Sequence, residues 1–373
     1  MGVISLFGAG RVEDTYNLIG HALEVVLDCA AKVSGYSKEN ICEQASLTLL
    51  GKSSIKVALD IDWNDDIQKN NALNQLISEV FSLKYWINEK LSKVKNAPPL
   101  KEALELLERV IAQNIEPDPD GSGSKIIEGV AKDRLISIHD KDMRHGRKSK
   151  SKTINGYKRH IAKDIDSGLI YAAAVRPANE PEHLISSELR KDVERQGVVD
   201  ELHIDRGYLA SDWAIHMDLL NKPVFSKPWR SSGKKFYSKE EFSIDLVSNT
   251  VKCPQGIRAN IKSNSAKFTS TNCDSCPMKA KCTESKNGRT ISIHENEELL
   301  IKLRQMANTS EGRKQLRERV TVEHSLAHIC SRQGRRARYS GINKNNLDLR
   351  RVAAINNLHT LMRFPQFNLK SAA

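Results

Sequence analysis

Two acidic residues, Asp205 and Glu323, stand where carboxylates could be brought together to bind metal ions. Asp205 ends the stretch VVDELHID (198–205), which predicts a strand, and Arg-Gly-Tyr follows it at once. In α/β folds, ligands bind at the carboxyl ends of strands. Glu323 belongs to RVTVEHSLAH (319–328), whose pattern predicts a helix. Together, an Asp and a Glu would supply hard oxygen ligands for two Mg²⁺ ions. Such ions activate an attacking hydroxyl and stabilise a leaving oxygen in phosphodiester chemistry.

Each carboxylate also has an ordinary structural interpretation. An Asp at the start of a turn often accepts hydrogen bonds from the backbone that follows it. Glu323 stands four residues after Arg319, and an exposed ion pair at this helical spacing contributes only about 0.3–0.5 kcal/mol. The predicted helix would pack on a sheet through an apolar stripe of Val322, Leu326, Ile329 and Cys330. The sequence leaves both interpretations open.

Basic residues crowd the stretch SRQGRRARYSG (331–341), which contains no acid. The chain of 373 residues has 58 Lys and Arg against 46 Asp and Glu, a formal net charge of +12. This balance favours a nucleic acid as partner, although charges that alternate along helices also simply solvate a surface. Phosphate contacts from basic side chains would position a nucleic acid without reading its sequence. The candidates for such contacts are Arg319, Arg335, Arg336, Arg338 and Lys344.

Four of the seven cysteines form a group with the spacing Cys253-x19-Cys273-x2-Cys276-x5-Cys282. Four thiolates would close a tetrahedral Zn²⁺ site, which resembles a zinc ribbon or knuckle. The last spacing differs from a second CxxC, so four thiols without metal remain an alternative, whereas disulfides are not expected in the cytoplasm. The other three, Cys29, Cys42 and Cys330, lie singly in helical patterns and predict small buried side chains.

The positions of Pro, Gly and Ser divide the chain into regions of different character. Helical periodicity runs through residues 13–110, and EPDPDGSGSK (116–125) reads as a solvated loop. Strand-like runs follow, and then a polar, turn-rich stretch that holds the cysteine group. We therefore predict a helical block at 1–115, the first part of an α/β core at 116–230, a Cys-rich insertion at 231–295, and the C-terminal helices of the core at 296–373.

The order of the strand-like runs predicts the topology of the core. The predicted strands are RLISIHD (134–140), TINGYKRHIAKD (153–164), LIYAAAVRP (169–177), VVDELHID (198–205) and KPVFSKP (222–228). Asp-Ser-Gly joins the second and third of these into a hairpin, and a helix leads from the third to the fourth. An antiparallel hairpin followed by a βα unit is typical of a mixed α/β sheet of the ribonuclease-H-like kind, not of a plain doubly wound one.

Several of these segments together resemble the insertion-sequence DDE transposases. The resemblance covers most of residues 8–363 and is carried by GAGRVEDTYNLIGHAL, SSIKVALDIDWNDD, DMRHGRKSKSKTINGYKRHIAKD, HIDRGYLAS and RERVTVEHSLAHICSRQGRRARYSGINKNNLDLRRVAAINNLHTLMR. It implies a ribonuclease-H-like fold, a Mg²⁺ site formed by an Asp-Asp-Glu triad, and cleavage and strand transfer at the ends of an insertion sequence. It further implies double-stranded DNA as the partner and a homo-oligomer on that DNA.

Residue by residue, the resemblance assigns Asp205 as the second acid and Glu323 as the Glu of the triad. Arg319 matches the Arg of the family's Tyr-Arg-Glu-Lys signature. The Tyr and Lys of that signature would fall at Leu316 and Cys330, which do not match. The resemblance also supports a cysteine-rich insertion before the helix that carries Glu323.

The first acid of the triad has no clear counterpart in this sequence. The resemblance implies an Asp on the first, central strand, shortly before GAGRVEDTYN, but MGVISLF contains no Asp. We expect an N-terminally truncated reading frame that lacks this strand, and hence weak or absent cleavage. A catalytically inactive DNA-binding remnant is the alternative function.

Four other acids are weaker candidates for the vacant role. They are Asp60 and Asp62 in ALDIDW, and Asp140 and Asp142 in HDKDMRHG. Asp140 is the best placed of them because it ends a predicted strand, although Arg144, Arg147 and Lys148 offer it salt bridges instead.

No run approaches the roughly 18 apolar residues of a membrane span, and no signal peptide is recognisable, so a cytoplasmic, nucleoid-associated protein is expected.

Overall fold

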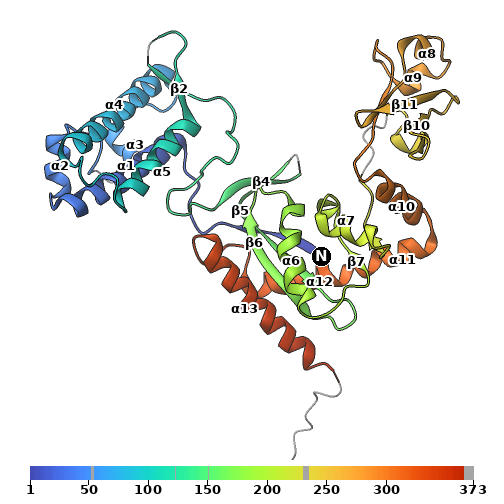
Figure 1. The fold of residues 1–373 in the computed structure, drawn as a ribbon. Helices are drawn as coiled ribbons and strands as arrows, with labels where there is room; N and C mark the ends of the chain where they lie inside the picture. The colour runs from blue at the N-terminus through green and yellow to red at the C-terminus, as the bar shows by residue number, and fades with distance from the viewer. Residues whose placement is uncertain (52–53, 122, 150, 230–234, 365–373) are drawn as a thin grey trace, which may run out of the picture.

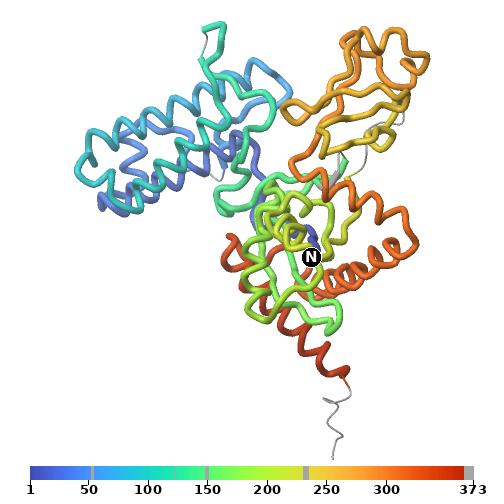
Figure 2. Tube along the Cα trace, turned by 45° about the vertical axis from the view of Figure 1, so that its right-hand side comes forward, coloured from blue at the N-terminus to red at the C-terminus, as the bar shows by residue number. Residues whose placement is uncertain are grey.

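The computed structural model describes residues 1–373 except 52–53, 122, 150, 230–234 and 365–373. Figure 1 shows a helical block, a central mixed α/β region and a smaller Cys-rich sheet, with a long C-terminal helix along the central region. In Figure 2, which is turned by 45°, the helical block and the Cys-rich sheet still lie on opposite sides of the central region. None of the helices in the described part of the chain combines the length and apolar character needed to span a bilayer.

The central sheet is built around β5 (Lys152–Lys163). Strand β6 (Ile170–Pro177) pairs antiparallel with β5, so the predicted hairpin is confirmed. Strand β1 (Gly2–Phe7) also pairs antiparallel with β5, from Gly2 opposite Ile161 to Phe7 opposite Gly156. Strand β4 (Arg144–Ser149) pairs antiparallel with the first part of β5.

Two short parallel strands form a separate small sheet beside the end of β1. Strands β7 (Leu202–His203) and β8 (Val224–Phe225) pair in parallel. The amino group of Met1 donates a hydrogen bond of 2.5 Å to the carbonyl oxygen of His203, which joins β1 to β7. Helix α6 (Ser186–Glu194) precedes β7, and α7 (Asp212–Leu219) lies between β7 and β8. An antiparallel sheet of β1, β4, β5 and β6 thus lies beside the parallel pair β7–β8, a mixed α/β arrangement as predicted.

The residues Gly2–Phe7 form strand β1, which was not predicted from the sequence, and Leu6 is fully buried beside Tyr157. Apolar and β-branched residues favour a strand, and β5 satisfies its backbone hydrogen bonds. The strand nevertheless carries no carboxylate. The helical block therefore begins after β1, at Thr15, and not at residue 1.

The prediction of a strand at 134–140 is also wrong. Leu135, Ile136 and Ile138 are buried, but the segment forms no ladder. Its backbone instead bonds to Glu13: the N–H of Glu13 donates to the Ile136 carbonyl at 3.0 Å, and the Ile138 N–H donates to Glu13 Oε2 at 2.9 Å. An apolar run predicts burial more securely than it predicts a strand, because buried backbone groups can be satisfied by side chains.

The helical block has its own hydrophobic core. It consists of α1 (Thr15–Ser34), α2 (Lys38–Gln44), α3 (Ile55–Leu59), α4 (Asp66–Lys90) and α5 (Leu100–Asn114). Asp14 caps α1 by accepting from the Asn17 N–H, and Gly35 ends it with φ of 76°. A hairpin of β2 (Ile115–Pro117) and β3 (Ser124–Ile126) follows α5. Side-chain caps and apolar stripes stabilise these helices. The prediction of helices over residues 13–110 is thus confirmed.

The Cys-rich segment forms a separate antiparallel sheet with the order β13-β12-β11-β10-β9. Its strands are β9 (Ser243–Asp245), β10 (Thr250–Lys252), β11 (Arg258–Lys262), β12 (Ser265–Lys267) and β13 (Thr290–Ser292). Two short helices, α8 (Ser270–Asp274) and α9 (Lys279–Cys282), lie between β12 and β13. Val251 and Phe268 are buried in a small core of its own.

Four helices complete the chain: α10 (Glu297–Asn308), α11 (Ser310–Glu318), α12 (Val320–Gln333) and α13 (Ile342–Leu361). The predicted apolar stripe of α12 is confirmed, since Val322, Leu326 and Ile329 are buried against the sheet. Helix α12 approaches β1 closely at Gly2, where a Cβ atom would lie 2.8 Å from Val322 Cγ1 and 3.0 Å from Leu326 Cδ1. Glycine at this position allows the contact.

Candidate active site

Asp205 stands directly after the short strand β7. Its Oδ1 accepts a hydrogen bond of 2.9 Å from the Arg206 N–H and so caps a short 3-10 helix, Arg206–Tyr208. The side chain remains 44% exposed. Capping and ligand binding are therefore compatible at this position, because the cap uses only Oδ1 and the side chain stays partly exposed.

Glu323 lies in the first turn of α12 with a side chain that is 53% exposed. Its Oε1 accepts a charge-assisted hydrogen bond of 2.5 Å from Arg319 Nη2. The other terminal nitrogen of the same guanidinium, Nη1, lies 3.8 Å from Asp205 Oδ2. Arg319 thus bridges two carboxylates that are far apart in the sequence, so the structure brings the two predicted acids together.

The two acids open onto one small pocket of about 120 Å³. Among the described residues, the carboxylates that line it are Asp205 and Glu323. The remaining lining residues are His203, Ile204, Phe225, Lys227, Leu316, Arg319 and Val320. Exposed carboxylate oxygens are ligands that Mg²⁺ prefers, so the donor type fits a magnesium site. Arg319 is the positively charged group between the two acids. A metal ion at this site would compete with Arg319 for the carboxylates of Asp205 and Glu323.

Lys227 is a pocket residue that the sequence reasoning missed. It follows β8, the parallel neighbour of β7, and its side chain is exposed. The carboxyl ends of adjacent parallel strands meet at one edge of a sheet, so the strand prediction at 222–228 carried the signal for it. With Arg319 it gives the pocket two positive charges next to two negative ones.

Several buried polar groups lie close to the two acids. Tyr208 is fully buried; its hydroxyl lies 2.6 Å from His160 Nδ1 and 3.3 Å from the Gly2 carbonyl oxygen. Burial lowers the pKa of His160 to about 3, and nearby Lys158 and Arg176 act in the same direction, so the imidazole is neutral near pH 7. Burial and the charge of Arg319 lower the pKa of the Met1 amino group to about 5, although Asp205 opposes them.

Asp140 does not join the other two acids. It is fully buried, and its Oδ1 accepts hydrogen bonds from the Tyr157 hydroxyl and from the Gly341 N–H at 3.0 Å. Tyr157, the partner of Asp140, lies opposite Leu6 in the sheet, whereas Asp205 lies near Met1. Leu6 and Met1 are about 17 Å apart along the strand. The interpretation of Asp140 as a catalytic acid therefore finds no geometric support, because its carboxylate holds the start of α13.

The other weak candidates among the acids also have local structural roles. Asp142 Oδ2 accepts a hydrogen bond of 2.8 Å from the Ile342 N–H at the start of α13. Asp62 Oδ1 accepts from the Asn64 N–H at 2.9 Å, and Asp60 ends α3 with φ of 45°. The predicted salt bridge of Asp140 with Arg144 is not formed, since Arg144 Nε instead bonds Asp133 Oδ1 at 2.7 Å. The side chain of Lys148 lies outside the described residues.

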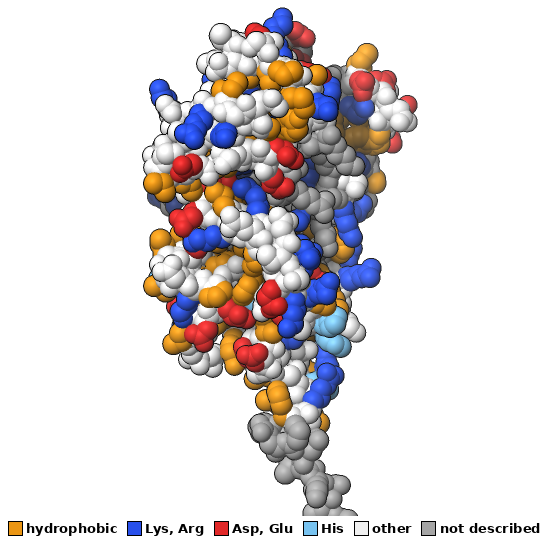
Figure 3. Space-filling view, turned by 90° about the vertical axis from the view of Figure 1, so that its right-hand side faces the viewer, with side chains coloured by type: hydrophobic (Ala, Val, Ile, Leu, Met, Phe, Trp, Pro, Cys, Tyr) orange, Lys and Arg blue, Asp and Glu red, His pale blue; other side chains and the backbone are white. Residues whose placement is uncertain are grey.

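The predicted basic cluster lies at the far end of α12. Arg335, Arg336 and Arg338 are exposed and follow the C-terminus of that helix, and Lys344 is exposed on α13. Helical rise puts Arg335 about 18 Å beyond Glu323. The expectation that the basic segment surrounds Glu323 is therefore wrong, and the basic side chains near Glu323 are instead those of Arg319 and Lys227. The arginine segment is instead held beside β1, where the Phe7 N–H donates to the Arg335 carbonyl at 2.9 Å. Figure 3 shows one face of the molecule, on which Lys and Arg side chains collect along one edge among interspersed acids.

The four predicted zinc ligands gather around one pocket of about 30 Å³ in the Cys-rich sheet. Cys253, Cys273, Cys276 and Cys282 are all half-buried free thiols. Burial raises the pKa of Cys282, Arg289 opposes this, and the other three cysteines reinforce it. In the described residues, three or more potential ligand atoms lie mutually within 4.8 Å only at Glu13, His21 and His139. The thiols are therefore the right donors but stand wider apart than Zn–S bonds of about 2.3 Å require.

Comparison with known families bears on the second half of the chain. Residues 249–362 match the family model described as "Transposase DDE domain". This match supports a DDE transposase. The matched segment contains Glu323, Arg319 and the four grouped cysteines, whereas Asp205 lies outside it. No curated protein and no solved structure matches the chain.

Proposed function

We propose that this chain is a DDE-type DNA transposase that cleaves DNA and transfers strands at the ends of an insertion sequence. The observation that carries the proposal is the pocket shared by Asp205 and Glu323, with Arg319 between them. The antiparallel strands β1, β5 and β6 with the parallel pair β7–β8 beside them support a ribonuclease-H-like core. The DDE match over 249–362 supports the same class.

Asp205 and Glu323 would hold Mg²⁺, and the metal would supply activation of the attacking oxygen and stabilisation of the leaving one. The protein's own contribution is electrostatic. Arg319 and Lys227 would bind the scissile phosphate beside the acids. Arg335, Arg336, Arg338 and Lys344, about a helix length away, would contact the DNA backbone at a distance from the cut. We further propose that the chain acts on double-stranded DNA as a homo-oligomer.

The decisive experiment is a cleavage and strand-transfer assay on DNA that carries the sequences flanking the gene, with Mg²⁺ or Mn²⁺. Because the first acid of the triad has no counterpart in MGVISLF, we expect weak cleavage at most by the unchanged chain. We expect a further loss of at least about 100-fold in Asp205→Asn and Glu323→Gln, because each removes a charged metal ligand. Glu311→Gln changes an exposed acid on α11 and is the matched control. Full activity in either site variant would contradict the assignment.

A catalytically inactive DNA-binding remnant is the alternative, and one observation favours it. In the described residues, the pocket offers two carboxylates, and both already pair with Arg319. Two metal ions held about 4 Å apart usually need more acidic ligands. Salt-dependent binding to DNA is expected in either case, since phosphate neutralisation releases counterions. Binding without cleavage in either metal would establish the remnant.

We also propose that Cys253, Cys273, Cys276 and Cys282 bind a structural Zn²⁺. Support comes from four thiols around one pocket in a small sheet whose core is modest. We expect that Cys273→Ser/Cys276→Ser lowers the zinc content of purified protein by about one equivalent per chain. Cys29→Ser, in α1, should leave it unchanged. Elemental analysis measures the content, and less than about half an equivalent in the unchanged chain would contradict the proposal.

A further inference from the structure

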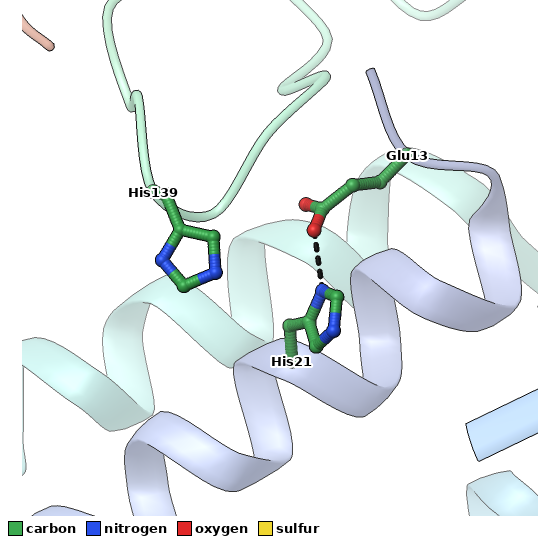
Figure 4. A group of neighbouring side chains, drawn as sticks. All are labelled: Glu13, His21 and His139. Atoms are coloured by element: carbon green, nitrogen blue, oxygen red, sulfur yellow. Dashed lines mark hydrogen bonds and ion pairs between the residues drawn. The ribbon is translucent and has the colours of Figure 1, made fainter. Parts of the chain in front are cut away.

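Three side chains near the start of the helical block form a compact group of metal-binding atoms. Glu13 precedes α1, His21 lies on α1, and His139 belongs to the loop at 134–140. One ligand atom from each lies within 4.8 Å of the other two. Figure 4 shows the Glu13 carboxylate above the His21 ring, with the hydrogen bond that joins them, and the His139 ring to one side of both.

The carboxylate of this group is held in place before any ion binds. Glu13 is only 7% exposed, and its Oε2 accepts a hydrogen bond of 2.9 Å from the Ile138 N–H. Its own N–H donates to the Ile136 carbonyl at 3.0 Å. These bonds fix Glu13 against the loop that presents His139. Outer hydrogen bonds that orient a carboxylate in this way are what metal sites require.

The two imidazoles differ in exposure, which leaves one side of the group open. His21 is half-buried, whereas His139 is exposed. Their ring centroids lie 5.7 Å apart with planes at 49° to one another, so both rings can direct a nitrogen toward one point. An ion bound there would keep a position for water, as three-ligand sites do.

The kind of donor selects the kind of ion. Two imidazole nitrogens and one carboxylate oxygen suit Zn²⁺ and similar transition metals, whereas Mg²⁺ prefers oxygen ligands alone. We propose that Glu13, His21 and His139 form a second metal site, which binds Zn²⁺ or a related divalent transition metal and is separate from the pocket at Asp205 and Glu323.

The position of the group determines the consequence of binding. The ion would join α1, in the helical block, to the loop that ends at Asp140. Asp140 in turn accepts a hydrogen bond from Gly341 at the start of α13. A metal ion here would therefore link the helical block to the central region, and its loss would loosen that link without touching the acids of the active site.

A simpler interpretation is that Glu13 and His21 form an ion pair and His139 is a neighbour. His139 separates the two interpretations, because the Glu13–His21 hydrogen bond does not involve it. His139→Ala changes an exposed side chain, so the variant is expected to fold. His359→Ala, which removes an exposed histidine from α13, is the matched control.

The test titrates the full-length, metal-stripped chain with Co²⁺ and follows its absorption spectrum. A nitrogen and oxygen site gives ligand-field bands, whereas the cysteine cluster adds sulfur-to-metal charge transfer, so the two kinds of site are told apart. We expect the unchanged chain and His359→Ala to show the nitrogen and oxygen site. In His139→Ala its affinity should fall at least about tenfold, because a direct ligand is lost.

Two further measurements complete the experiment. Added Zn²⁺ should raise the midpoint of thermal unfolding in the unchanged chain and in His359→Ala by more than in His139→Ala. His21→Ala should abolish the nitrogen and oxygen site. Equal Co²⁺ affinity and an equal Zn²⁺-induced shift in His139→Ala and in the unchanged chain would overturn the proposal.

Discussion

Replacing Arg159 with methionine is expected to lower the free energy of unfolding by about 3–5 kcal/mol, since several buried acceptors lose their donor at about 1–3 kcal/mol each; this is a large part of the stability of a typical domain. Arg159 lies in β5 and is fully buried. Its guanidinium donates to the Ser5 carbonyl at 2.8 Å, the Gly334 carbonyl at 2.9 Å and Gln333 Oε1 at 3.0 Å. Methionine would leave these acceptors in the protein interior without a donor.

The loss should also reach the candidate active site, because Arg159 holds the end of α12. The same guanidinium contacts Cys330 Sγ at 2.9 Å, in the last turn of the helix whose first turn carries Glu323. Urea unfolding curves measure the change in stability. Arg338→Met, at an exposed position in the segment after α12, should change it by less than about 0.5 kcal/mol. A loss below about 1 kcal/mol in Arg159→Met would show that α12 is anchored elsewhere.

Replacing Asp140 with alanine is expected to cost about 2–4 kcal/mol of stability. The substitution would remove the acceptor of both the Tyr157 hydroxyl and the Gly341 N–H, and each buried donor left alone costs about 1–3 kcal/mol. Asp140→Asn should cost much less, because an amide oxygen can still accept both bonds. Thermal or urea unfolding distinguishes the two variants.

The same pair of variants decides whether Asp140 is structural or catalytic. If its role is structural, Asp140→Asn keeps both stability and any DNA cleavage, whereas Asp140→Ala loses both. A catalytic ligand would behave differently: Asp140→Asn would then remain stable and lose cleavage, which would contradict the structural assignment. Asp166→Ala, at an exposed turn position between β5 and β6, is the control: it also removes an acidic side chain, but it should leave both stability and cleavage unchanged.

The sequence predicted those features that depend on local patterns. The β5–β6 hairpin follows from alternating strands around Asp-Ser-Gly, and the apolar stripe of α12 follows from helical spacing. Asp205 and Glu323 were predicted to lie together because two-metal chemistry needs both carboxylates and because the resemblance assigns them to one triad. Arg319 was predicted as a helical partner of Glu323, but its second contact, with Asp205, depends on the tertiary fold.

The features that were missed depend on contacts between distant segments. No strand was predicted at Gly2–Phe7, yet β5 supplies a partner for every residue of this segment. The run at 134–140 is buried as predicted, but the carboxylate of Glu13 replaces the strand partner that the pattern implied. The basic segment after α12 follows Glu323 in sequence, but the length of the helix separates them in space. None of these contacts has a local signal in the sequence.

The close contact at Gly2 has a consequence for the geometry of the two acids. Helix α12 rests on β1 where residue 2 has no side chain, and Val322, which makes the contact, is the immediate neighbour of Glu323. A methyl group at residue 2 would act as a spacer under the first turn of α12. It would press on Val322 and Leu326, so the first turn of α12, which carries Glu323, would have to shift relative to Asp205, which follows β7. The distance between the two carboxylates therefore depends on the absence of a side chain at residue 2.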